Sequence, residues 1–304
     1  MDDLKWSEGS IPDQSGRTAL VTGANSGIGF EAARALAEKG ARVLLGCRNS
    51  AKAAAAFDHI RSVAPDANIA ILSLDLSELA SIHKAAAHVS STEPRLDMLI
   101  NNAGVMAIPK QTTADGFEMQ FGTNHLGHFA LTGLLIDLLD ATAGARVVNI
   151  SSNGHRFGRV NFDDVNAERG YHRWIRYGMS KVSNLIFTYE LQRRLEAHGR
   201  STIAVACHPG GATTQLGRDA GALMHFFQPM ADRVLQSAAM GALPTLRAAT
   251  DPKVKGGDYY GPDGLGQIIG HPVKVHSNAY SHRRDVGVQL WAVSEHMTEV
   301  DYLD

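Results

Sequence analysis

The segment RTALVTGANSGIG (residues 17–29) joins a short apolar run to a turn that contains three glycines. The run 17–23 is apolar and β-branched without alternation, which is typical of a strand covered on both faces. Residues 27–40 then show apolar side chains at helical spacing and end at Gly40. We therefore predict a strand, a glycine turn and a helix in direct succession.

The same alternation continues along most of the chain. It predicts an α/β fold, a doubly wound parallel sheet flanked by helices on both faces (Rossmann-type). No internal repeat or low-complexity linker interrupts it, so we expect a single domain over 1–304, with a nucleotide-binding part at 15–150 and a catalytic and substrate part at 151–304. The further strands are predicted at 41–47, 68–76, 96–104, 145–152 and 201–210, and the further helices at 50–64, 77–90, 117–140 and 175–198.

Composition excludes several classes of protein. The 304 residues are 44% hydrophobic and 20% charged, with a formal net charge of −2 and no Lys/Arg block, so no nucleic-acid partner is predicted. The polar N-terminus is unlike a secretory signal, and the longest apolar run, 129–139, is too short and too interrupted to span a membrane. Cys47 and Cys207 lie in strand-like runs and are expected to be buried thiols. We expect a cytoplasmic protein without a membrane span.

The fourteen histidines raise the question of a metal site. His125 and His128 lie three residues apart, but no HExxH, CxxC or carboxylate cluster accompanies them. We therefore predict packing or solvent-exposed histidines and no metal.

The glycine turn has the features of a phosphate-binding turn. Gly23 permits a tight turn, Gly27 lets backbone amides approach a pyrophosphate, and Gly29 lets the following helix pack close to the sheet. The helix N-terminus then offers unpaired N–H groups and the positive end of its dipole to the anion. The turn therefore predicts a dinucleotide site at the carboxyl ends of the strands.

The TGxxxGxG spacing of this turn resembles that of the short-chain dehydrogenase/reductase family. The resemblance continues in order over about 20–210, and several segments are most similar to the retinol-dehydrogenase-like branch, among them NHLGHF and NISSNGHRFGRV. The matching motifs are LDL (74–76), NNAG (101–104), NHLGHF (124–129), NISS (149–152), YGMSK (177–181) and HPG (208–210).

The resemblance implies further cofactor contacts. Asp75 and Leu76 would border the adenine, and Thr214 matches the contact to the nicotinamide carboxamide better than Thr213 does. The residues that it adds to the glycine turn are Asn25, Ser26, Ile28, Asp75, Leu76, Asn102, Ala103, Gly104, Pro209, Gly210 and Thr214.

The end of the second predicted strand bears on the form of the cofactor. It reads LLGCRNS and has Arg48 where an acidic residue would bind the ribose of NAD. A guanidinium can pair with a 2′-phosphate in a forked geometry. We expect NADP(H) to be preferred and NAD(H) to be possible, the alternative being that Arg48 is an exposed loop residue.

Tyr177 and Lys181 lie one helical turn apart in YGMSK. A free tyrosine has a pKa near 10, and a lysine on the same face can lower it by stabilising phenolate. Tyr177 could then donate a proton to a carbonyl or accept one from an alcohol. By family analogy, Lys181 would also hydrogen-bond the nicotinamide ribose.

A serine and an asparagine complete the predicted catalytic set. Ser152 ends a strand where ligands bind and can hydrogen-bond the substrate oxygen, with Ser151 as the alternative. Asn124 matches the family's asparagine that holds a proton-relay water, and a satisfied buried amide is the alternative. The predicted function is interconversion of a carbonyl and an alcohol by hydride transfer; a non-catalytic NAD(P)-binding regulator and an NAD-dependent dehydrogenase or epimerase-type relative are the rival hypotheses.

Two segments rich in aromatic residues and methionine, 153–176 and 221–230, predict an apolar substrate pocket. Packing of these segments is the alternative explanation. We expect a small lipophilic carbonyl or alcohol substrate. The family commonly dimerises through its two long helices, here 117–140 and 175–198, so a homodimer or homotetramer is possible. The apolar residues of the second helix also fit burial within one subunit.

Overall fold

A computed structural model describes residues 5–211 and 236–303. Its centre is a sheet in the order β3-β2-β1-β4-β5-β6-β7-β8, in which all neighbouring strands are parallel except the pair β7 and β8. The predicted doubly wound parallel sheet is therefore confirmed. The strands are β1 (Thr18–Thr22), β2 (Arg42–Cys47), β3 (Ile69–Ser73), β4 (Met98–Asn101), β5 (Arg146–Ile150), β6 (Ile203–Cys207), β7 (Tyr259–Pro262) and β8 (Pro272–Lys274).

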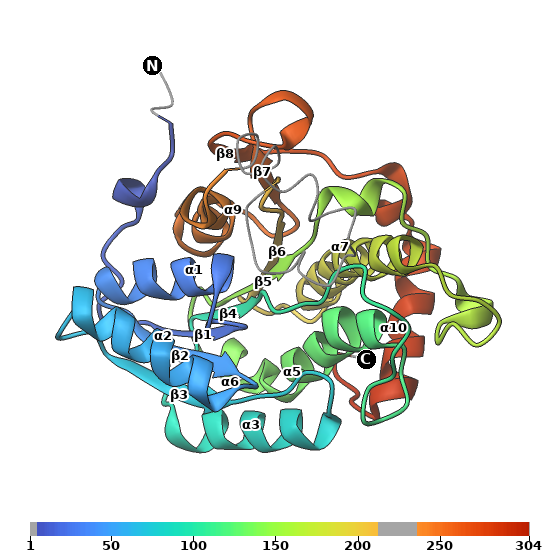
Figure 1. Cartoon of the computed structure of the whole chain (residues 1–304), viewed down its shortest axis with the longest axis horizontal. Coiled ribbons are helices and arrows are strands. Elements are labelled where there is room, and N and C mark those ends of the chain that lie inside the picture. Colours follow the sequence, from blue (N-terminus) through green and yellow to red (C-terminus); the bar gives the residue numbers. More distant parts are fainter. Residues whose placement is uncertain (1–4, 212–235, 304) are drawn as a thin grey trace.

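Helices cover both faces of this sheet (Figure 1). Because side chains alternate along a strand, Ala19 and Val21 of β1 belong to the core beneath one layer and Leu20 to the core beneath the other. This double burial is the reason that the strands read as uninterrupted apolar runs. One layer contains α1 (Gly27–Glu38), α2 (Ser50–Val63) and α9 (Ala238–Thr250), and the other contains α3 (Leu79–Thr92), α5 (Gly127–Leu134) and α7 (Arg173–Ala197).

The helix expected at 117–140 is interrupted. It consists of α4 (Met119–Phe121), a π-helical turn (Gly122–Leu126), α5 and α6 (Ile136–Asp140). The Glu118 carboxylate accepts hydrogen bonds from Gln120 N and Phe121 N and thereby begins the first piece. The π-helical turn contains Asn124, so the interruption lies at a predicted site residue.

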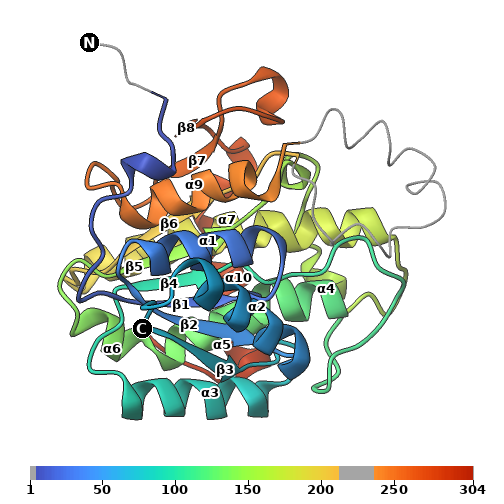
Figure 2. The same cartoon turned by 60° about the vertical axis from the view of Figure 1, so that its left-hand side comes forward.

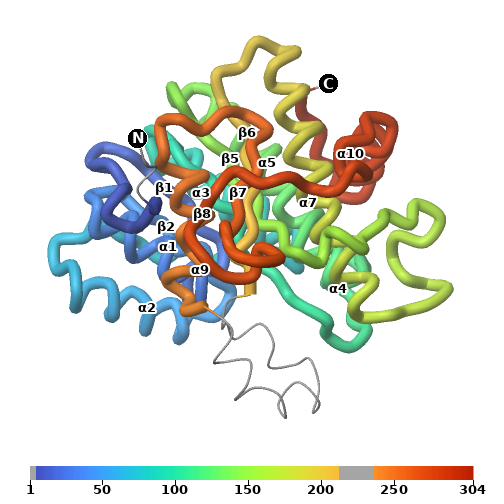
Figure 3. Tube along the Cα trace, turned by 90° about the horizontal axis from the view of Figure 1, so that it is seen from above, coloured from blue at the N-terminus to red at the C-terminus, as the bar shows by residue number. Residues whose placement is uncertain are grey.

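The described residues of the C-terminal third include two strands and two α-helices that the sequence analysis does not predict. β7 and β8 have four and three residues, too few for a recognisable pattern. Pro244 lies inside α9. Because proline normally ends a helix, the sequence pattern does not predict a helix here. α10 (Arg284–Thr298) packs against α7 and α5 (Figure 3). The N-terminal segment lies beside β8. His271, which directly precedes this strand, contacts Trp6 O through Nδ1 at 3.0 Å (Figure 2).

The apolar residues of α7 are buried inside the chain itself. Val182, Leu185 and Leu191 are fully covered, and α10 packs along the helix. Burial within one subunit therefore accounts for the apolar faces of this helix. A homodimer or homotetramer stays a prediction.

Both cysteines are buried free thiols, as predicted. Burial raises the pKa of Cys47 to about 11 and that of Cys207 to about 12, so both are protonated at neutral pH. Over 5–211 and 236–303, the helices are all too short or too polar to cross a membrane.

Candidate active site

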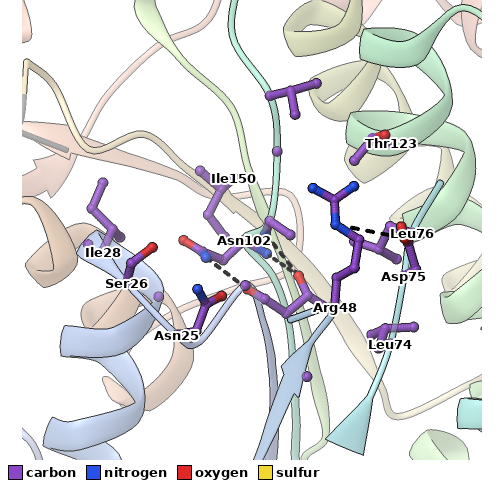
Figure 4. A pocket seen from close by; sticks show the side chains of 18 of the residues that line it. Asn25, Ser26, Ile28, Arg48, Leu74, Asp75, Leu76, Asn102, Thr123 and Ile150 are labelled. Carbon is purple, nitrogen blue, oxygen red and sulfur yellow. Dashed lines mark hydrogen bonds and ion pairs between the residues drawn. The ribbon is translucent and has the colours of Figure 1, made fainter. Parts of the chain in front are cut away.

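A cleft of about 340 Å³ opens at the carboxyl ends of the central strands (Figure 4). It runs from the glycine turn past the NNAG loop to α7, so it brings together segments that lie far apart in the sequence. The predicted site residues that line it are Gly23, Asn25, Ser26, Gly27, Ile28, Gly29, Arg48, Asp75, Leu76, Asn102, Ala103, Gly104, Tyr177, Lys181 and Pro209.

The glycine turn is close-packed. Gly23 and Gly27 have φ values of +68° and +55°, in the left-handed region that favours glycine. A Cβ on Gly29 would lie 2.5 Å from Gly23 O and 2.3 Å from Asn102 Nδ2. The absence of side chains therefore allows α1 to begin directly against the strand ends, with its amides facing the cleft.

Thr22 fastens the glycine turn to the NNAG loop. Its hydroxyl accepts hydrogen bonds from Asn102 N and Ala103 N, each at 2.9 Å, while Asn102 Nδ2 donates to Thr22 O at 2.8 Å. The carboxyl ends of β1 and β4 are thereby locked together.

Two cationic residues that follow β2 and one carboxylate that follows β3 line the same part of the cleft. Arg48 is 67% exposed and its Nε lies 3.8 Å from the Asp75 carboxylate, toward which it extends in Figure 4. Lys52, in the first turn of α2, lines the same cleft. Sequence reasoning missed Lys52, although its position one turn after Arg48 was a usable signal.

Tyr177 and Lys181 are nearly buried, at 8% and 5% exposure. Burial raises the pKa of Tyr177, and a hydrogen bond with Ser152 lowers it by less. Burial also lowers the pKa of Lys181 to about 8; its Nζ lies 5.9 Å from the centre of the phenol ring and donates to Ile150 O at 3.2 Å. The lowered tyrosine pKa predicted from the Tyr–Lys spacing is therefore wrong for this structure, because burial raises the pKa by more than the hydrogen bond with Ser152 lowers it.

The two serines after β5 have different partners. Ser151 Oγ donates to Lys181 O at 2.8 Å, which commits its proton to the backbone of α7. Ser152 Oγ accepts from Gly154 N at 3.1 Å and hydrogen-bonds Tyr177. Ser151 contributes to the cleft lining, whereas Ser152 lies beside it.

Asn124 also lies behind the cleft wall. Its Nδ2 donates to Val105 O and Ser180 Oγ, both at 2.9 Å, and its Oδ1 accepts from Val105 N at 2.8 Å. Every hydrogen-bonding position of the amide except one oxygen lone pair is thus occupied by protein groups.

His128 links Asn124 to the glycine turn. Its Nδ1 lies 3.0 Å from Asn124 O and its Nε2 lies 2.9 Å from Thr22 Oγ1. A carbonyl can only accept, so Nδ1 carries the proton and Nε2 accepts from the threonine. Burial lowers the pKa of His128 to about 4, which keeps this tautomer neutral. Sequence reasoning predicted for His128 only that it packs or is exposed to solvent and does not bind a metal.

The remaining predicted residues divide into two groups. Gly210 follows Pro209 but does not line the cleft, and its φ is +68°. Thr214, Thr213 and the segment 221–230 lie outside the described residues.

The described part of the chain contains no group of three or more His, Cys, Asp or Glu that could hold a metal ion. The lining residues that sequence reasoning missed are Thr22, Gly46, Asn49, Lys52, Leu74, Val105, Thr123 and Ile150.

Comparison with known proteins identifies the family. A profile of the short chain dehydrogenases matches residues 17–223. Human retinol dehydrogenase 13 is 40% identical over 303 residues, which cover 97% of this chain and 87% of that protein. The crystal structure of an uncharacterised protein from Mycobacterium paratuberculosis is 37% identical with a TM-score of 0.83, over 98% of this chain and 99% of that chain. A Shigella flexneri short chain dehydrogenase complexed with NADP is 25% identical with a TM-score of 0.64, over 82% of this chain and 98% of that chain.

The fold and the cleft define a Rossmann-type protein with a nicotinamide-dinucleotide site. The chain belongs to the short-chain dehydrogenase/reductase family, in its retinol-dehydrogenase-like branch. It is an NAD(P)-dependent oxidoreductase.

Proposed function

We propose that this protein interconverts a carbonyl and an alcohol with NADP(H) as cofactor and with Tyr177 as general acid and base. The observation that carries the proposal is the shared cleft: Tyr177 and Lys181 form one end of its wall and the glycine turn forms the other. A dinucleotide held at the turn would therefore share one cleft with this ionisable pair.

The residues present fit a dinucleotide. A side chain on Gly29 would fill the space where the turn meets the NNAG loop, and the amides at the start of α1 are placed for a pyrophosphate. Arg48 and Lys52 favour a 2′-phosphate, and Asp75 alone opposes it. This charge balance supports NADP(H) over NAD(H).

The chain's own groups handle the proton and the developing charge. A bound nicotinamide would supply or accept the hydride. Tyr177 is protonated at neutral pH, since the ordinary tyrosine pKa is near 10 and burial raises it, so its hydroxyl can donate to a carbonyl oxygen. Ser152 hydrogen-bonds that hydroxyl and can stabilise charge on the same oxygen, which supports Ser152 over Ser151 in this role.

Lys181 and Asn124 position these groups. Lys181 Nζ is held at Ile150 O and, by family resemblance, would hydrogen-bond the nicotinamide ribose. Asn124 clamps Val105 to Ser180, whose hydroxyl donates to Tyr177 O at 2.8 Å. Its side chain therefore holds the cleft wall to α7, and a relay water would have to use the oxygen's remaining lone pair.

The substrate is proposed to be a lipophilic carbonyl or alcohol. Trp174 packs edge-on against Tyr177 with the ring centres 6.4 Å apart, and Phe157 is 57% exposed nearby against Gly178. These aromatic rings beside the proton donor support an apolar substrate, and the name of the related human retinol dehydrogenase points the same way. The cytoplasmic location stays a prediction.

The test is an assay for NADPH oxidation against a panel of lipophilic aldehydes and ketones, with NADPH and NADH affinities measured by titration. Tyr177→Phe should lower kcat by about 10²- to 10⁴-fold, the usual contribution of a general acid, and leave NADPH affinity unchanged. Failure to bind either nucleotide would overturn the proposal, and full turnover by Tyr177→Phe would remove that residue from its role.

The two adjacent serines provide a matched control. Ser152→Ala should lower kcat by about tenfold or more, as expected for loss of a hydrogen bond to developing charge. Ser151→Ala removes the bond to Lys181 O, not a bond to Tyr177, and should have the smaller effect on kcat.

A further inference from the structure

The loop between β7 and β8 (residues 263–270) closes on itself. Asp263 N donates to His271 O at 2.9 Å and Gly264 N donates to Ile269 O at 3.0 Å. At its tip Gly266 and Gln267 both adopt left-handed conformations, with φ values of +62° and +57°. A left-handed conformation is unusual for glutamine. Gln267 also accepts several hydrogen bonds from other segments of the chain.

Gln267 holds the HPG segment. Gly210 N donates to His208 Nδ1 at 3.2 Å, so the ring proton is on Nε2, which donates to Gln267 Oε1 at 3.1 Å. The next loop residue, Ile268, accepts from Gly211 N at 2.7 Å. The loop thus hydrogen-bonds the side chain of His208, before Pro209, and the backbone of Gly211, after it.

The fold makes room for this contact. A Cβ on Gly261 of β7 would lie only 2.1 Å from His208 Nε2, so only glycine lets the ring reach past the strand. His208 is fully buried, and burial lowers its pKa to about 4. A neutral donor is therefore aimed at the Gln267 amide oxygen.

Gln267 also holds the segment that follows Ser152, Asn153–Arg156. Asn153 Nδ2 donates to Gln267 O at 3.2 Å and to Gly266 O at 3.3 Å. Arg156 donates to Gln267 Oε1 at 3.1 Å, so that oxygen receives hydrogen bonds from both segments. Asn153 directly follows Ser152, which hydrogen-bonds Tyr177.

We propose that Gln267 is a positioning residue that sets the separation between Ser152 and Pro209, on the two sides of the substrate end of the cleft. The inference rests on the proposed function. It assigns a role to the loop 263–270, which contacts neither Tyr177 nor Lys181. One amide oxygen and one backbone carbonyl tie together segments more than fifty residues apart in the sequence.

Three variants test this role. Gln267→Met keeps the size of the side chain but lacks the acceptor, and Gln267→Glu keeps an oxygen that both His208 and Arg156 can use. Leu265→Ala is the matched control, because Leu265 is 95% exposed in the same loop. The first readout is amide hydrogen exchange of the cofactor-free protein over 152–158 and 208–211. Exchange should accelerate in both segments in Gln267→Met alone.

The second readout is steady-state kinetics with NADPH and the best carbonyl substrate found. Gln267→Met should lower kcat by about tenfold, the size expected for loss of the two hydrogen bonds to the amide oxygen, with NADPH affinity unchanged. Gln267→Glu should restore most of kcat. Unchanged exchange in Gln267→Met, or accelerated exchange in only one segment, would overturn the proposal. Because exchange is measured without cofactor or substrate, it tests this role even if the proposed reaction fails.

Discussion

Arg48 is the residue on which the proposed preference for NADP(H) mainly rests. In the structure its guanidinium is largely exposed and 3.8 Å from the Asp75 carboxylate, with Lys52 lining the same cleft. An exposed pair of this kind contributes little to stability, so the arginine is available to an anionic ligand. Arg48 either binds the 2′-phosphate or is an exposed loop residue, and nucleotide affinities distinguish these two alternatives.

Arg48→Ala should weaken NADPH binding by about 10- to 100-fold, the range for a charge-assisted hydrogen bond. NADH binding should stay unchanged, since NADH has no 2′-phosphate. Both affinities can be measured by fluorescence titration. Lys84→Ala, which changes an exposed cation on α3 away from the cleft, serves as the control. Equal losses for the two nucleotides would refute the phosphate contact.

At the scale of elements, the start of α1 decides whether the cleft can form. Gly29 has no free volume around it, because Gly23 O and Asn102 Nδ2 occupy the space of a Cβ. The glycine therefore matters for packing three segments together: β1, α1 and the NNAG loop.

Gly29→Ala should separate α1 from the NNAG loop. We expect a loss of about 1–3 kcal/mol of unfolding free energy, as for other overpacked sites, and NADPH binding at least about tenfold weaker. Urea unfolding and nucleotide titration measure the two effects. Gly170→Ala is the control, since a Cβ there would meet nothing within 4 Å. Wild-type NADPH affinity in Gly29→Ala would contradict the role of this close packing.

Across the whole molecule, buried histidines make stability depend on pH. Burial lowers the pKa of His125 to about 3, and those of His128 and His208 to about 4, from an ordinary value of 6.5. The unfolded chain therefore binds more protons than the folded chain between about pH 4 and 6.5. Stability is fully present above that window and is lost as the pH falls through it.

Near pH 5 these three histidines should together lower the unfolding free energy by about 4 kcal/mol per pH unit, about 1.4 from each. Urea titrations at pH 8, 6 and 5 measure this slope. His125→Phe should reduce it by about 1.4 kcal/mol per pH unit, because phenylalanine does not titrate and the site is lined by Phe121, Phe129 and Phe187. A stability that does not change from pH 8 to pH 5 would contradict the prediction.

The sequence predicted most of the nucleotide-binding half because its signals are local. The strand at 18–22, the turn at Gly23 and the helix at 27–38 follow one another, so residue spacing reports their geometry. The same holds for Tyr177 and Lys181 on one helix. The short strands β7 and β8 and the proline-containing α9 lack such signals, and the direction of the tyrosine pKa shift depends on burial, which spacing does not report.

The sequence by itself determined the alternating α/β order, the glycine turn and the spacing of Tyr177 and Lys181 on one helix, since each is encoded within a few neighbouring residues. Only the tertiary structure decided that Lys52 joins Arg48 in the cleft wall, that His128 connects Thr22 to Asn124, and that Gln267 reaches His208 and Asn153. The contacts of His128 and Gln267 bridge distant segments or depend on space left by glycines elsewhere. They arise from packing in three dimensions, which no short pattern in the sequence records.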